Sequence, residues 1–120
     1  MAIYHLSVKI GSRANSNSAV ASASYRSAEK LYSHTDNKTF DYTRKQAVVY
    51  TEIMLPENAP KEYADREILW NGVEMSEKQA NAQLYREFEI SLPNECTRDE
   101  QIEMTSGFED SLRQEGVCAD

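Results

Sequence analysis

The sequence is short of the residues that many cofactor and nucleophile motifs require. Its 120 residues include two cysteines, two histidines and four glycines. Cys96 and Cys118 stand apart and form no CxxC pair, so reduced thiols are expected in preference to a disulfide or a zinc site. There is no glycine-rich phosphate loop and no GxSxG motif. These absences exclude dehydrogenases, P-loop enzymes and most hydrolases, and two histidines cannot make a three-histidine metal site.

Long apolar runs are also missing. Hydrophobic residues make up 40% of the chain and charged residues 28%, and no stretch is long and apolar enough to cross a bilayer. The segment MAIYHLSVKIGSR has no basic start, apolar run and small-residue cleavage site, so no secretion signal is expected. We therefore expect a single soluble domain over residues 1–120, located in the cytoplasm and without a membrane partner.

The charge is divided unevenly along the chain. The net charge is −7, which by itself argues against a nucleic-acid partner. Residues 1–50, however, hold seven basic and three acidic side chains, a balance of +4, whereas residues 51–120 hold six and seventeen, a balance of −11. Six aromatic residues lie among the basic ones in the first half. This mixture suits single-stranded nucleic acid, although ordinary charge scatter on a surface explains the asymmetry equally well.

Alternating apolar and polar residues predict the strands. Residues 2–10 place Tyr4, Leu6, Val8 and Ile10 on one face, and residues 83–93 alternate in the same way. Residues 47–55 are rich in β-branched side chains and predict a further strand. The polar faces favour an antiparallel sheet with one open face. The predicted fold class is therefore α+β: a mainly antiparallel sheet with helices on one face.

Helices are expected between these strands. Residues 19–32 read as a helix capped by Ser18, followed by a polar connection with a turn at Asp36-Asn37. A second helix is expected at about 60–78, either continuous or broken in two. The sequence TRDE at 97–100 is a capping box for a last helix that ends near residue 115. The final VCAD then looks like the start of another strand.

Three polar positions are candidates for chemistry. Tyr25 lies among alanines and serines, with Tyr32 seven residues further along, and these small neighbours leave room for a bulky substrate to approach. His5 and Glu87 fall on the polar faces of the first and last strands, and a catalytic interpretation expects them to converge with Tyr25 near the open face of the sheet. The plainer interpretation stays open: Tyr25 at the edge of the core, His5 as an ordinary hydrogen-bonded residue, and Glu87 on a solvated strand.

At these residues the sequence resembles a known family. The blocks AIYHLSVKIGSR, SAVASASYRSAEKLY, DYTRK, TEIMLPENAP, DREILWN and REFEISLPNE are similar, in this order, to blocks of the MobA/MobL-type plasmid mobilisation relaxases. The resemblance covers nearly the whole chain. It implies the fold of the HUH relaxases, with single-stranded DNA and the active site on the open face of the sheet. Members nick one DNA strand at a plasmid origin of transfer by tyrosine attack, and the tyrosine stays joined to the 5′ end.

The resemblance assigns roles to individual residues. The nucleophile falls on Tyr25, and the acidic residue of the second motif falls on Glu87, where it would orient a metal-bound histidine or the tyrosine hydroxyl. Tyr32 is expected to help hold DNA. The basic residues expected to contact the strand are Lys9, Arg13 and Arg26.

The family's metal motif is a strand of closely spaced histidines, which is expected beyond Asp120. The resemblance thus implies a divalent metal, Mg²⁺ or Mn²⁺, for a full domain and none bound by these 120 residues. On this interpretation the chain is the N-terminal portion of a relaxase domain and is inactive, or nearly so, by itself. The partners implied are single-stranded origin DNA and relaxosome accessory proteins, and an incomplete sheet edge would invite dimerisation.

Other interpretations predict different behaviour. A rolling-circle replication initiator shares the tyrosine chemistry, but there the tyrosine usually follows the histidine motif. A non-catalytic single-strand-binding or assembly module of the same fold predicts salt-sensitive binding without a covalent adduct. An unrelated soluble α+β domain predicts neither.

Overall fold

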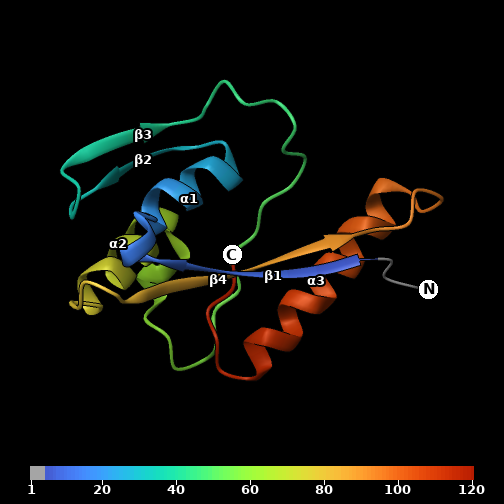
Figure 1. The fold of residues 1–120 in the computed structure, drawn as a ribbon. Coiled ribbons are helices and arrows are strands. Elements are labelled where there is room, and N and C mark those ends of the chain that lie inside the picture. The colour runs from blue at the N-terminus through green and yellow to red at the C-terminus, as the bar shows by residue number, and fades with distance from the viewer. Residues whose placement is uncertain (1–4) are drawn as a thin grey trace.

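The computed structural model describes residues 5–120 and has an α+β fold, as predicted (Figure 1). It contains two separate antiparallel two-stranded sheets, β1 with β4 and β2 with β3, instead of one larger sheet. The elements in chain order are β1 His5–Ser12, η1 Arg13–Asn15, α1 Ala19–Ser27, β2 Lys30–Ser33, β3 Lys38–Asp41, η2 Lys61–Ala64, α2 Arg66–Ser76, β4 Gln83–Ser91 and α3 Arg98–Gln114.

β1 and β4 form a long ribbon across the molecule (Figure 1). Leu6 pairs with Ile90 and Val8 with Phe88, so the apolar residues of both strands lie on one face, as the alternation predicts. This face is only partly covered, because Leu6 and Val8 remain about half exposed. α3 packs on it through an edge-to-face contact between Phe88 and Phe108, with ring centroids 5.4 Å apart. Of the predicted strand, Tyr4 and the residues before it lie outside the described residues, as does the side chain of His5.

The core lies at the other end of the molecule. One buried cluster is formed by α1 and β2 through Val20, Ala23 and Leu31, and the second joins α1 to the start of β4. Trp70 of α2 packs against both clusters. The small side chains of α1 thus let it approach β2 and α2 closely.

The prediction of one helix over residues 19–32 is wrong from residue 28 onward. α1 ends at Ser27, and Ala28 adopts a left-handed conformation with φ of 58° that reverses the chain. The buried hydroxyl of Ser24 donates to the carbonyls of Glu29 and Phe40 and so ties the reversed chain to α1. Leu31 then enters the core from a strand. These tertiary contacts outweigh the local helical preference of the segment.

The turn predicted at Asp36-Asn37 is present, but the other predictions for residues 33–55 are wrong. The polar connection contains β3, which forms a hairpin with β2 through a turn at residues 34–37. Residues 47–55 form no strand. Only Met54 pairs, in an isolated bridge with Ala119, which is also all that VCAD forms of a further strand. A strand requires a neighbour along its length, and within residues 5–120 this segment has none beyond that bridge.

The helices after residue 60 agree with those predicted from the sequence. The helix expected at 60–78 is broken in two, with η2 ending before Asp65, which caps α2 by accepting hydrogen bonds from the backbone of Glu67 and Ile68. The capping box at Thr97 and Glu100 is present at the start of α3. Among the described residues, no helix combines the length and apolarity needed to cross a membrane.

Candidate nucleic-acid interface

Tyr25 lies in the last turn of α1 with 43% of its surface exposed. Its ring meets that of Tyr42 edge to face, with centroids 5.2 Å apart. The Nζ atom of Lys45 lies 3.7 Å from the Tyr25 ring centroid and donates a 3.0 Å hydrogen bond to the Tyr25 carbonyl oxygen. The guanidinium of Arg26 lies 5.1 Å from the same centroid. The tyrosine is therefore accessible, held by one aromatic ring and flanked by two cations.

A groove of about 670 Å³ lies between α1 and the β2–β3 hairpin and includes Tyr25. One wall is the face of α1 with small side chains. The other wall is β3 and the residue that follows it. The lining residues are Ser18, Ala21, Ser22, Tyr25 and Arg26 on the α1 side, Asp36, Lys38, Phe40 and Tyr42 on the hairpin side, and Arg13, Ser16 and Asn17 at one end.

The groove and the ribbon differ in charge. The groove is lined by three cations and one carboxylate. The polar face of the ribbon, by contrast, holds Lys9 opposite Glu87, with Glu89 3.8 Å from the Lys9 ammonium. Two carboxylates thus accompany Lys9 on that face, but Glu87 is also paired with Arg26 of α1. Arg13 of the groove is likewise paired with Glu74, so these ion pairs cancel most of the difference in charge between the two surfaces.

Arg26 and Glu87 form an ion pair between α1 and β4. The hydrogen bond from Glu87 raises the pKa of Arg26 against the opposing effect of burial. One turn before Arg26, Ser22 hydrogen-bonds the hydroxyl of Tyr85 at 2.7 Å. The Tyr85 ring lies directly over Gly11, where a Cβ atom would be 2.1 Å from it. The described contacts thus bring Glu87 to Arg26, the neighbour of Tyr25 in the chain, and a role for Glu87 at the site stays a prediction.

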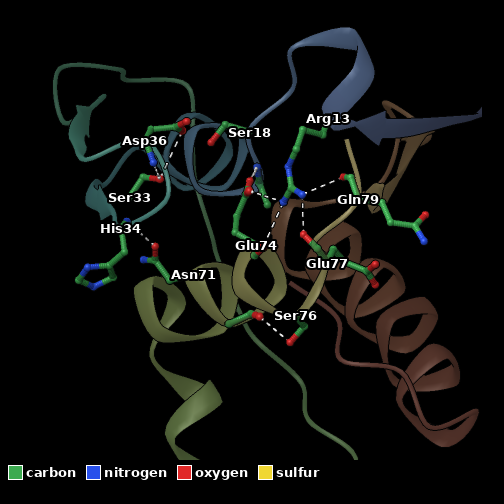
Figure 2. A network of polar contacts seen from close by, with 12 residues as sticks. Arg13, Ser18, Ser33, His34, Asp36, Asn71, Glu74, Ser76, Glu77 and Gln79 are labelled. Carbon is green, nitrogen blue, oxygen red and sulfur yellow. Dashed lines mark hydrogen bonds and ion pairs between the residues drawn. The ribbon is translucent and has the colours of Figure 1, made fainter. Parts of the chain in front are cut away.

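The Arg13 side chain binds the end of α2 and the residues that follow it (Figure 2). Its guanidinium donates to the carbonyl oxygens of Glu74, Glu77 and Gln79 and to the Glu74 carboxylate. The other oxygen of Glu74, itself 5% exposed, accepts a 2.7 Å hydrogen bond from the backbone of Ala19 at the start of α1. Arg13 and Glu74 therefore join α1 to α2. A DNA contact by Arg13 stays a prediction, but these four hydrogen bonds already use much of its donor capacity.

α2 also fixes the hairpin, as Figure 2 shows in part. Asn71, which is buried, donates to the carbonyl of Tyr32 at 2.7 Å and accepts from the backbone of His34 at 2.8 Å. Glu67, one turn earlier, accepts from the backbone of Tyr32 at 2.7 Å. These side chains occupy backbone groups of β2 that would pair with a neighbouring strand. The hairpin wall of the groove is therefore rigidly attached.

Tyr32 is not on the same helix face as Tyr25, because it lies on β2. Its hydroxyl donates to Asn37 in the hairpin turn, and its ring contacts His34 with centroids 5.0 Å apart. It is absent from the groove lining. The structure therefore does not bring the two tyrosines together, and a DNA contact by Tyr32 stays a prediction.

Sequence reasoning missed the hairpin side of the groove. Lys38, Phe40 and Tyr42 alternate after the Asp36-Asn37 turn, which is the pattern of a short strand following a hairpin turn. Lys45 gave no comparable signal, because its approach to Tyr25 depends on the path of the chain after β3.

A second hollow of about 390 Å³ lies between β2, α2 and the segment before η2. Its charged lining residues are Arg66 and four acidic residues, Glu29, Glu52, Asp65 and Glu67. Arg66 is bonded to Glu29 and Asp120. Burial alone would lower the pKa of Arg66, but these hydrogen bonds raise it.

Nearby, burial and then the charges of Glu52 and Asp120 raise the pKa of Glu109 to about 7. Across residues 5–120, no three His, Cys, Asp or Glu side chains gather in an arrangement that could hold a metal.

Comparison with known proteins gives a consistent assignment. The model of the MobA/MobL family matches residues 17–120. All of the chain aligns with 31% of mobilization protein MobL of Acidithiobacillus ferridurans at 41% identity, and with 12% of conjugal transfer protein TraA of Rhizobium radiobacter at 40% identity. The chain thus spans a third or less of these relatives. A solved structure described as "Molecular Basis of Vancomycin Resistance Transfer in Staphylococcus aureus" matches 98% of this chain and 60% of its own, with 41% identity and a TM-score of 0.92. The chain belongs to the MobA/MobL family.

Proposed function

We propose that the chain is the N-terminal part of a relaxase that nicks one DNA strand at a plasmid origin of transfer. The observation that carries the proposal is Tyr25, an exposed tyrosine that lines a groove and is flanked by Arg26 and Lys45. The similar proteins named mobilization and conjugal transfer proteins support the same role. On this proposal the partners are single-stranded plasmid DNA and accessory proteins of conjugation, and the reaction takes place in the cytoplasm.

The proposed reaction is a transesterification. The Tyr25 hydroxyl oxygen attacks the scissile phosphorus, and the bond between phosphorus and the 3′ oxygen breaks. Tyr25 loses its proton and the leaving 3′ oxygen gains one, so no water is consumed. The 5′ phosphate stays on the tyrosine, which allows later resealing by the reverse step. Arg26 and Lys45, both within 5.1 Å of the Tyr25 ring centroid, would offset the phosphate charge.

A divalent metal, Mg²⁺ or Mn²⁺, is part of the proposal for a longer chain. The described residues offer no metal cluster, so they do not fit a metal site by themselves, and its ligands would have to come from a segment beyond Asp120. No step is therefore assigned to the metal here. Glu87 is proposed as a positioning residue that acts through Arg26, to which it is bonded.

Covalent capture on a denaturing gel tests the proposal. The 120-residue chain and a version extended through the downstream segment of its relatives are each incubated with single-stranded origin DNA and Mg²⁺ or Mn²⁺. We expect a shifted band for the extended protein, lost in Tyr25→Phe, and little or none for the short chain. Nicking retained in Tyr25→Phe would reject the nucleophile. Binding without any adduct in either protein would instead indicate a non-catalytic DNA-binding or assembly module.

A further inference from the structure

Tyr85 of β4 is held in place by its surroundings. It pairs with Gly11 of β1, and a Cβ atom on Gly11 would lie 2.1 Å from the Tyr85 ring, so the glycine leaves the space that the ring occupies. The Trp70 ring meets the Tyr85 ring edge to face, with centroids 6.3 Å apart. Tyr85 also packs against the buried cluster that joins α1 to the start of β4. Contacts on several sides of the ring therefore set the position of its hydroxyl.

The Tyr85 hydroxyl contacts the middle of α1. It shares a 2.7 Å hydrogen bond with Ser22, which lies one turn before Tyr25 on this helix of nine residues. Residues three apart in a helix are neighbours on successive turns. A shift of α1 at Ser22 therefore moves Tyr25 as well.

A second polar contact joins α1 to β4, the ion pair between Arg26 and Glu87. The two contacts agree in spacing, because Tyr85 and Glu87 lie two residues apart on one face of the strand. Ser22 and Arg26 lie four residues apart on one face of the helix. The Arg26 side chain is 55% exposed, so water and salt weaken its ion pair. The bond between Tyr85 and Ser22 joins neutral, partly buried groups and is not weakened in this way.

We propose that Tyr85 is a positioning residue for the nicking reaction, which acts through Ser22 to fix α1, and with it Tyr25, relative to β4. Tyr85 is not among the described residues that line the groove, so its effect is on the nucleophile and not on the bound strand. The inference rests on the proposed function and adds a residue to which the resemblance assigns no role.

The informative variant is Tyr85→Phe in the extended protein, because it removes the hydroxyl and keeps the ring over Gly11. The rate of adduct formation with Mg²⁺ or Mn²⁺ is measured at increasing concentrations of single-stranded origin DNA. We expect the rate at saturating DNA to fall about tenfold, since a displacement of about 1 Å can cost about 100-fold. The DNA concentration that gives half of this rate should change by less than about twofold. This split separates positioning from DNA binding.

The matched control is Tyr63→Phe, which makes the same chemical change on η2. Tyr63 is also partly buried, and its ring also lies close to a glycine, Gly72. We expect both kinetic quantities to stay unchanged in this variant. Urea midpoints verify that each variant is folded. Equal losses of rate in Tyr63→Phe and Tyr85→Phe would overturn the inference, because they would reflect a general loss of packing.

Variants of Ser22 test whether the effect passes through the hydrogen bond. Ser22→Ala should lower the saturated rate about as much as Tyr85→Phe. The double variant should fall no further than about twofold below either one, because each change removes the same bond. Ser22→Thr keeps a hydroxyl and should retain most of the rate. Losses that multiply in the double variant would overturn the inference.

The unmodified extended protein separates this inference from the proposed function. If it forms an adduct that requires Tyr25, and Tyr85→Phe forms the adduct equally fast, the positioning role alone is rejected. If the unmodified protein forms no adduct, nicking is rejected and the positioning role with it.

Discussion

The two ends of the molecule are built in different ways. At one end, α1, α2 and the β2–β3 hairpin bury residues such as Val20, Leu31 and Leu69 and satisfy the edge of β2 with side chains of α2. At the other end, α3 contains no fully buried residue, and Leu6 and Val8 of the ribbon stay about half exposed. The candidate groove belongs entirely to the first end. The site proposed for Tyr25 thus lies on the part of the chain with the denser packing, which suits a residue that has to be held in place.

The largest effect is expected at the packed end. Leu31 is 5% exposed between α1 and the hairpin, and Leu31→Ala should lower the free energy of unfolding by about 3 kcal/mol, because it leaves a cavity that a rigid hairpin cannot fill. Urea denaturation measures the loss. A cost below about 1 kcal/mol, typical of an exposed position, would mean that the two ends are packed alike.

A smaller effect is expected at the α3 end. Phe108→Ala removes the ring that meets Phe88, but Phe108 is only partly buried. We expect a loss of about 1–2 kcal/mol, which combines the aromatic contact with partial burial. The same denaturation experiment, run beside Leu31→Ala, should rank the two variants in this order. The reverse order would contradict the comparison of the two ends.

The cap at the start of α3 should contribute less to the free energy of unfolding than either the aromatic or the aliphatic contact above. Thr97 accepts a hydrogen bond from the backbone of Glu100 in the capping box, and Thr97→Ala should cost about 1 kcal/mol. Thr105→Ala, in the middle of α3 and exposed, makes the same chemical change without removing a cap and serves as the control. Thermal unfolding should separate the two variants, and equal melting temperatures would argue against the cap.

A last expected effect is a dependence of stability on pH. The pKa of Glu109 is raised from 4.5 to about 7 by burial and by the charges of Glu52 and Asp120, against weaker lowering by Arg66 and by the backbone of Met54. Because the folded state holds this proton more tightly, the stability it contributes is complete below pH 4.5 and is lost as the pH rises through about 7. Urea midpoints of Glu109→Gln should therefore fall less between about pH 5 and 8 than those of the unmodified chain. Parallel pH profiles would show that Glu109 titrates as an ordinary exposed carboxyl.

The sequence predicted correctly those helix starts and strands that depend on residues close together in the chain. The capping box at Thr97, the Ser18 cap and the alternation of β1 and β4 all follow from residues within a few positions of each other. The end of α1 did not, because Ala28 takes a left-handed conformation that Ser24 and Leu31 stabilise through contacts with the hairpin. Ala is rarely chosen for that conformation, so the sequence carried no sign of it.

The sequence indicated only part of the candidate site, because some of its residues are brought together by contacts between distant segments. Tyr25 and Glu87 were assigned by resemblance, and the structure places Arg26 beside both of them, but their roles stay predictions. Lys45 was not found, because the chain after β3 brings it back to α1 without a regular element. Tyr32 was misplaced once the helix was extended past Ser27.

The hydrogen bond from Lys45 to the carbonyl of Tyr25 has one further consequence. Aligned peptide dipoles leave partial negative charge at the carboxyl end of a helix, which repels anions. Tyr25 lies at that end of α1, where a phosphate would otherwise meet repulsion. The Lys45 ammonium on this carbonyl and Arg26 in the same turn counter the dipole before any DNA is present. The charge at the carboxyl end of α1 is thereby suited to the phosphate that the proposed function would bring there.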